Sequence, residues 1–233
     1  MKHSEVMLYL SSFVRYQPTF YRYRPYTMIG RLRYLENLAL AKIAINDTSL
    51  QEGVIIECGT WRGGMAAGLI SVGGPKRKYY FFDSFEGLPP AEDIDGQKAK
   101  VYQASPEAPE YANNCSATLH EFKSTIALTG CPAENIDIRQ GFFEQSFKSF
   151  NSPPVALLRL DADWYSSTMA CLEKFWDSVL PGGLILIDDY YHWDGCTKAV
   201  HEFLTTRQTT ERIRQGRIGG VAFIRKEPPS ANL

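Results

Sequence analysis

The sequence predicts an α/β protein with a doubly wound, mostly parallel sheet and helices on both of its faces. Short apolar runs typical of buried strands occur at 54–58, 79–83, 136–139, 155–160, 184–187 and 221–224. Segments with helical character lie between them, at 63–71, 116–129, 168–179 and 198–204. Strands that alternate with helices indicate βαβ units and therefore a parallel sheet. Pro181, Gly182 and Gly183 predict a turn before the run at 184–187.

The chain has 233 residues, which is enough for one α/β domain with its own core. We expect this domain to span residues 51–233 and to carry an N-terminal helical extension or lid at residues 1–50. The net charge of -1 predicts neither a nucleic-acid partner nor binding to an anionic membrane. No apolar run is long enough to span a bilayer. The scattered cysteines favour reduced thiols and a cytoplasmic location, with Cys58 and Cys171 in the core.

The segment 84–114 fits neither a helical nor a strand period, and it contains Pro89, Pro90, Pro106 and Pro109. It is far longer than an ordinary connection between two elements of an α/β domain. A lid or binding loop over the site and a disordered segment are equally consistent with this composition.

Four aspartates lie in two clusters, each directly after a predicted strand. Asp161 and Asp163 follow the strand at 155–160, and Asp188 and Asp189 follow the strand at 184–187. Because ligands collect at the carboxyl ends of parallel strands, we expect these carboxylates to converge on one rim. They would repel one another without a counter-ion, and a hard divalent cation with oxygen ligands resolves that repulsion. The pattern therefore predicts a metal-assisted enzyme.

The spacing within each cluster suggests separate roles for its members. On an extended backbone Asp161 and Asp163 project to the same side, so Asp161 can bind metal while Asp163 acts as the general base. The alternative role for Asp163 is to cap the following helix. Asp188 and Asp189 can both be ligands only if the chain turns there; the alternative is one ligand and one cap. His192 is an alternative base.

A glycine-rich turn follows the first predicted strand and precedes a helix. Gly59 and Gly63 allow the backbone to approach a ligand there, but the G-x-G-x-x-G dinucleotide fingerprint is absent. Glu57, at the end of the first strand, suits a cofactor with a positive ammonium group. Asp83, at the end of the next strand, is placed to accept hydrogen bonds from ribose hydroxyls. Together these features favour S-adenosylmethionine over NAD, whereas a fold that binds no nucleotide would use the glycines only for tight packing.

The chain resembles the macrocin O-methyltransferase (TylF-type) family, which methylates sugar hydroxyls in antibiotic biosynthesis. The resemblance spans most of the chain, and the segments that carry it are Thr27 to Gly30, Glu57 to Gly64, Asp83 to Pro90, Leu158 to Thr168 and Asp188 to Tyr190. It implies a Rossmann-like class I methyltransferase with a mostly parallel seven-stranded sheet. It also implies S-adenosyl-L-methionine, Mg²⁺ and a homodimer.

Position by position, the resemblance implies a set of site residues. Asp161, Asp188 and Asp189 correspond to the Mg²⁺ ligands, and Asp163 corresponds to the general base. The implied cofactor contacts are Thr27, Met28, Glu57, Cys58, Gly59, Thr60, Trp61, Asp83, Ser84, Phe85, Glu86, Gly87, Ser116, Asp161 and Ala162. Ala162 and Trp164 stand where the family pattern has a glycine and a smaller apolar residue, which leaves the acceptor open.

The sequence thus predicts a magnesium- and S-adenosylmethionine-dependent O-methyltransferase that acts on a vicinal diol. The expected acceptor is a small molecule, a deoxysugar on a natural product, and an aromatic catechol is the alternative within the same chemistry. A nicotinamide dehydrogenase is disfavoured because the dinucleotide fingerprint is absent. A non-catalytic cofactor-binding protein is the third alternative.

Overall fold

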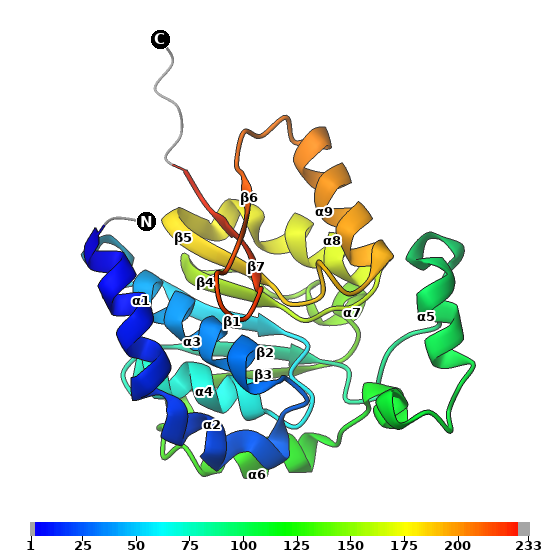
Figure 1. Ribbon diagram of the computed structural model, residues 1–233, viewed down its shortest axis with the longest axis horizontal. Coiled ribbons are helices and arrows are strands. Elements are labelled where there is room, and N and C mark those ends of the chain that lie inside the picture. Colours follow the sequence, from blue (N-terminus) through cyan, green and yellow to red (C-terminus); the bar gives the residue numbers. More distant parts are fainter. Residues whose placement is uncertain (1–2, 228–233) are drawn as a thin grey trace.

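A seven-stranded sheet forms the centre of the protein in the computed structural model, which describes residues 3–227 (Figure 1). Its strands are β1 (Val54–Cys58), β2 (Tyr79–Asp83), β3 (Ile136–Gln140), β4 (Val155–Leu160), β5 (Val179–Ile187), β6 (Ile213–Gln215) and β7 (Ala222–Arg225). The strand order is β3-β2-β1-β4-β5-β7-β6. The first five strands of this order are parallel, and β7 is antiparallel to both of its neighbours. The predicted Rossmann-like, mostly parallel sheet is confirmed.

Helices cover both faces of this sheet. Alternate residues of a strand point to opposite sides, and the buried strands present apolar side chains to both. The α-helices are α1 (His3–Arg15), α2 (Gln17–Tyr23), α3 (Arg31–Asn46), α4 (Gly64–Gly73), α5 (Gly96–Gln103), α6 (Leu119–Ala127), α7 (Phe143–Ser146), α8 (Tyr165–Phe175) and α9 (Asp194–Thr206). Ile55 and Leu157 belong to one apolar cluster, together with residues of α1 to α4 and α6. Ile56 and Leu158 belong to a second cluster, together with residues of α8 and α9.

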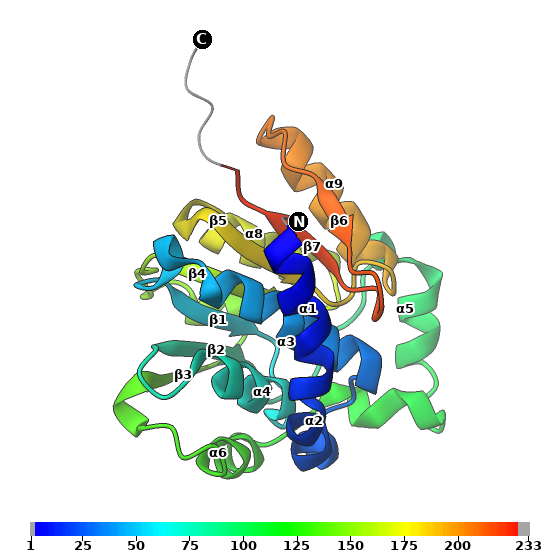
Figure 2. The same ribbon diagram turned by 60° about the vertical axis from the view of Figure 1, so that its left-hand side comes forward.

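The N-terminal helices are fastened to the rest of the domain. Figure 2 shows α1 lying along α3. Glu5 of α1 forms an ion pair with Arg225 of β7 at 2.9 Å. Tyr9 of α1 donates a hydrogen bond to the buried carboxylate of Glu36 in α3, which also accepts from the backbone N–H of Val221 at 2.7 Å. Among residues 3–227, none of the helices is long and apolar enough to span a bilayer.

Some predicted boundaries were wrong. Helix α8 begins at Tyr165 and ends at Phe175, earlier at both ends than the predicted 168–179. The residues from Pro181 to Gly183 lie within β5 and do not form a free turn, because the Gly182 N–H bonds Lys226 O at 2.7 Å and the Lys226 N–H bonds Gly183 O at 2.9 Å. The three-residue edge strand β6 was not predicted.

The segment 84–114, here called the lid, is folded. It contains α5 and a 3-10 turn at Asp93–Asp95. A second 3-10 segment begins at Pro109 and ends at Cys115, and left-handed residues at 112–114 interrupt it. Figure 1 shows α5 beyond the carboxyl ends of the parallel strands. This position supports a lid or binding segment over a disordered one.

Candidate active site

A cavity of about 1690 Å³ lies at the carboxyl ends of the parallel strands. Its wall combines the turns after β1, β2, β4 and β5 with the start of α3, the start of α8 and much of the lid. Asp161, Asp163, Asp188 and Asp189 all line it. The sheet therefore brings the two predicted acidic clusters to one site.

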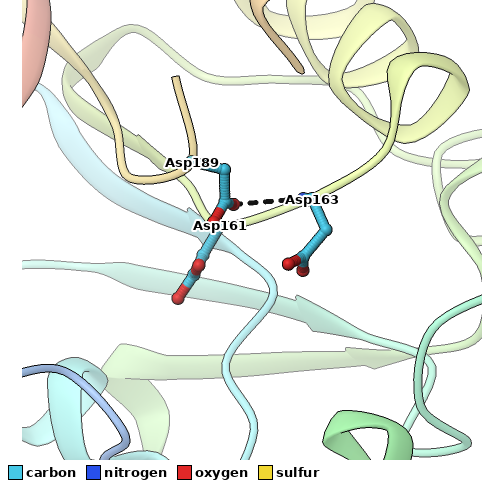
Figure 3. A group of neighbouring side chains, drawn as sticks. All are labelled: Asp161, Asp163 and Asp189. Atoms are coloured by element: carbon cyan, nitrogen blue, oxygen red, sulfur yellow. Dashed lines mark hydrogen bonds between the residues drawn. The ribbon is translucent and has the colours of Figure 1, made fainter. Parts of the chain in front are cut away.

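Three of these aspartates form a compact group. Carboxylate oxygens of Asp161, Asp163 and Asp189 lie within 4.8 Å of one another (Figure 3). Asp189 also accepts a hydrogen bond from the backbone N–H of Asp163 at 3.1 Å. Gly59, at φ 81°, lets β1 and β4 approach closely here, because a Cβ would lie 1.8 Å from the carbonyl oxygen of Asp161. A group of oxygen donors with this spacing fits a hard divalent cation.

Asp188 does not belong to this compact group. Its carboxylate forms ion pairs with Arg159 at 3.0 Å and Arg33 at 3.6 Å, and accepts from Asn37 Nδ2 at 3.4 Å. The chain turns directly after β5, so Asp188 and Asp189 face different neighbours. The turn that the sequence required for a shared site is present, but in this structure only Asp189 joins the group.

Arg159 is the buried cation under the site. Its side chain is fully buried and contacts Glu57 at 2.8 Å, Asp161 at 2.9 Å and Asp188 at 3.0 Å. Burial alone would lower the pKa of Arg159, but the three carboxylates outweigh it and raise the pKa well above its usual range. Sequence reasoning missed this residue. The available signal was a single charged residue inside an apolar strand.

Asp163 does not have the extended backbone that the sequence argument assumed. Its φ is 56°, in the left-handed region, and its Oδ1 accepts from Trp193 Nε1 at 2.8 Å. Burial, followed by the charge of Asp161, raises the pKa of Asp163 to about 8. The N-cap of α8 is Trp164, and it makes no side-chain capping bond. Asp163 is therefore not the cap of this helix.

His192 lies at the cavity wall beside Lys98 of the lid. The Lys98 ammonium is 3.3 Å from His192 Nδ1, and an ammonium can only donate. Nδ1 therefore accepts, and the neutral ring carries its proton on Nε2. Burial, followed by the charges of Lys98 and Arg33, lowers the pKa of His192. In this arrangement His192 presents a donor, which disfavours it as the base.

Asp83 and the glycine-rich turn form one hydrogen-bonded unit. Asp83 Oδ2 accepts from the backbone N–H groups of Thr60 at 2.6 Å and Trp61 at 2.9 Å, and Oδ1 accepts from that of Phe85 at 2.7 Å. A carboxylate has about four acceptor positions, so one position on Oδ1 is left for a ribose hydroxyl.

Glu57 is buried at the end of β1, and only one of its oxygens is bonded. Oε1 contacts Arg159, whereas Oε2 has no hydrogen-bond partner among the described residues. Glu57 borders a small cavity that is also lined by Thr27, Met28, Thr60, Trp61 and Asp161. Burial raises the pKa of Glu57 to about 8 despite Arg159. An unpaired buried carboxylate oxygen beside a glycine-rich turn fits the ammonium of S-adenosylmethionine.

These raised pKa values predict that the ligand-free protein loses stability as the pH rises. The folded state keeps protons on Glu57 and Asp163 that the unfolded chain has already released, so their stabilising contribution is lost as the pH rises towards the folded pKa of about 8. Each group changes the unfolding free energy by about 1.4 kcal/mol per pH unit in that window. The two groups together cost about 4–5 kcal/mol over this range, so we expect the melting temperature to fall by about 10–20 °C between about pH 6 and about pH 8.

Thermal unfolding without divalent cations measures this fall. Asp163→Asn, whose amide resembles the neutral carboxyl, should show a smaller fall. A melting temperature that stays constant over this pH range in both proteins would contradict the raised pKa values of Glu57 and Asp163.

Residues 15–225 match the macrocin-O-methyltransferase (TylF) family. The chain belongs to this family. The 8-demethyl-8-(2,3-dimethoxy-alpha-L-rhamnosyl)-tetracenomycin-C 4'-O-methyltransferase of Streptomyces olivaceus is 30% identical over 185 residues, which cover 76% of this chain and 67% of that protein. The mycinamicin III 3''-O-methyltransferase of Micromonospora griseorubida is 29% identical over 204 residues, covering 82% and 76%.

Two solved methyltransferase structures share the fold of this chain. The O-methyltransferase NovP superposes with a TM-score of 0.71 at 22% identity, covering 87% of this chain and 83% of NovP. The calicheamicin methyltransferase CalS11 superposes with a TM-score of 0.61 at 19% identity, covering 89% and 91%. Family membership and relatives that are named O-methyltransferases identify the chain as an O-methyltransferase.

The other predicted cofactor contacts of this macrocin O-methyltransferase family member divide into two sets. Those on the wall of the large cavity are Met28, Gly59, Thr60, Trp61, Asp83, Ser84, Gly87, Asp161 and Ala162. Cys58, Phe85, Glu86 and Ser116 line neither cavity described here. Cys58 is buried, and Ser116 meets the glycine-rich turn through its carbonyl oxygen, which accepts from Trp61 Nε1 at 3.0 Å.

Proposed function

We propose that this O-methyltransferase moves a methyl group from S-adenosylmethionine to one hydroxyl of a vicinal diol on a sugar of a natural product, with Mg²⁺ as a second cofactor. The observation that carries the proposal is the meeting of the Asp161, Asp163 and Asp189 carboxylates in the cavity that the glycine-rich turn also lines. The Streptomyces olivaceus relative is named for a rhamnosyl derivative of tetracenomycin C, which agrees with a sugar acceptor.

Asp161 and Asp189 are two of the proposed Mg²⁺ ligands. Both correspond to ligands in the family pattern, and both belong to the compact acidic group. Asp188 is the third ligand by the family pattern, and its carboxylate would have to turn away from Arg159 to take that role. When bound, Mg²⁺ supplies a Lewis acid that lowers the pKa of the acceptor hydroxyl. Three carboxylates suit it, because Mg²⁺ takes oxygen donors.

Asp163 is the proposed general base. Trp193 donates to its Oδ1, and we assign the proton of the acceptor hydroxyl to Oδ2. On the cofactor side, Glu57 Oε2 would hold the ammonium and Asp83 Oδ1 would hold a ribose hydroxyl. Two fixed contacts of this kind would restrict the orientation of the methyl donor, which lowers the entropic part of the barrier.

The cavity favours a glycoside over a small catechol. Its volume of about 1690 Å³ exceeds the roughly 300–1,000 Å³ that is typical of a site for one small molecule, so it has room for the cofactor and a glycosylated acceptor together. Its wall also carries the exposed apolar side chains of Leu32, Val101 and Ile218. An apolar aglycone attached to the sugar would cover them. The homodimer, the cytoplasmic location and the extension at residues 1–50 stay predictions.

Turnover of S-adenosylmethionine to S-adenosylhomocysteine tests the proposal. We expect turnover with mycinamicin III, for which the Micromonospora griseorubida relative is named. We expect none with catechol, and loss of turnover with EDTA that added Mg²⁺ restores. Chelator-insensitive turnover would remove Mg²⁺ from the mechanism, and a preference for catechol would move the acceptor to the aromatic class.

Glu57→Gln tests the ammonium contact. The amide has the same shape but no charge, so the charge-assisted bond to the cofactor ammonium is weakened. We expect the dissociation constant of S-adenosylhomocysteine, measured by calorimetry, to rise about 10-fold to 100-fold. Glu134→Gln, an exposed glutamate before β3, should bind like the unaltered protein. Equal affinities for both variants would rule out this role for Glu57.

A further inference from the structure

The lid contacts Trp164 and Tyr165, which follow β4 and the acidic residues, and it reaches Asp163 through Trp193. Trp193, which donates to Asp163, packs edge-on against Tyr102 of the lid, with ring centroids 5.5 Å apart. Pro89 O of the lid accepts from the Trp164 indole at 2.8 Å. Asp95 Oδ1 accepts from the backbone N–H of Tyr165, the first residue of α8, at 2.7 Å.

Asp95 caps α8 from a distant part of the chain. It is 2% exposed although it belongs to the lid, and α8 has no capping side chain of its own. A carboxylate is favourable at the positive end of the helix dipole. Gly195 permits the contact, because a Cβ at this position would lie 2.2 Å from Asp95 Oδ1. Asp95 does not line the cavity.

Asp163, which directly precedes Trp164 and Tyr165, has an uncommon backbone conformation. Asp163 has φ 56°, which is rare for a residue other than glycine and persists where neighbouring structure holds it. Here the neighbouring residues Trp164 and Tyr165 are both bonded to the lid. Release of the lid would therefore free the backbone that aims the Asp163 carboxylate into the cavity.

We propose that Asp95 is a positioning residue that caps α8 and thereby makes the orientation of Asp163 depend on docking of the lid. The proposal rests on the proposed function for the role of Asp163 in catalysis. The structural part of the proposal is the coupling between the lid and residues 163–165. This coupling does not depend on the identity of the acceptor.

Hydrogen exchange of the full chain with S-adenosylhomocysteine bound tests the coupling. Asp95→Ala removes the cap, and we expect exchange in residues 96–103 and in residues 161–169 to accelerate together, by about tenfold. Asp95→Asn keeps an oxygen that accepts from the Tyr165 N–H and should restore most of the protection. Asp93→Ala is the matched control, because the exposed Asp93 carboxylate contacts Lys100 within the lid. It should behave like the unaltered protein.

The Mn²⁺ dissociation constant, measured by electron paramagnetic resonance, gives a second readout at the acidic group. We expect Asp95→Ala to raise it severalfold, Asp95→Asn to bring it back, and the affinity for S-adenosylhomocysteine to stay within twofold. Faster exchange in the lid alone, with residues 161–169 unchanged, overturns the proposal. If the unaltered protein binds no Mn²⁺, the proposed metal role fails while the exchange data still decide the role of Asp95.

Lys198→Met loosens the lid without changing Asp95 and applies if Asp95→Ala does not fold. The exposed Lys198 ammonium donates to Ile94 O at 2.8 Å. The same joint acceleration, of smaller size, is expected for this variant. Acceleration of residues 96–103 only would again contradict the coupling.

Discussion

Arg159→Met is expected to destabilise the folded chain by about 3–5 kcal/mol. Methionine fills much of the same space but removes the cation that Glu57, Asp161 and Asp188 share. Those carboxylates then face one another in a buried setting, where their repulsion is strong. The loss should be largest at neutral and higher pH and smaller in acid, because protonation removes the unpaired negative charge.

Chemical denaturation near neutral pH measures this loss, and Arg139→Met provides a matched control. Arg139 forms an ion pair with Asp137 at 2.7 Å, but both side chains are 37% exposed. Such a pair contributes about 0–1 kcal/mol, so the control should remain close to the unaltered protein. If both variants lose the same small amount of unfolding free energy, Arg159 and its three carboxylates do not form the electrostatic centre of the site.

Arg159 also shows what the sequence could and could not predict. The strands β1, β2 and β4 were predicted at their observed bounds, because buried parallel strands read as continuous apolar runs. Their carboxyl ends then had to place Glu57, Asp83 and Asp161 at one edge of the sheet. Whether a side chain at this edge turns towards a ligand or towards a buried partner depends on three-dimensional neighbours. A local sequence pattern could therefore not predict that the Asp188 carboxylate binds Arg159.

The start of α8 was missed for a similar reason. Its cap is supplied by Asp95, which lies 70 residues earlier in the chain. Local sequence offered Asp163 as the cap, and the left-handed backbone of Asp163 could not be inferred from an aspartate in this position. The edge strand β6 has only three residues, which is too short to show a strand period.

Asp161→Asn is expected to lower methyl transfer by at least about 1,000-fold, because the several kcal/mol that a Lewis acid contributes correspond to about that factor. Asp161 belongs to the compact acidic group and also contacts Arg159 at 2.9 Å. The amide keeps the shape of the side chain but not its charge, so we also expect Mn²⁺ affinity to fall by about tenfold or more. The measurements are turnover with a glycosylated acceptor and electron paramagnetic resonance of Mn²⁺.

Asp137→Asn is the control for this variant, since its carboxylate lies on β3 and contacts Arg139. It should keep both turnover and Mn²⁺ affinity. Asp188→Asn then separates the two roles that the structure and the family pattern give to Asp188. A ligand role requires Mn²⁺ affinity to fall about as far as in Asp161→Asn, whereas a role confined to Arg159 lowers stability and leaves that affinity nearly unchanged. If Asp161→Asn itself retains Mn²⁺ binding and turnover, the proposed catalysis at this acidic group is wrong.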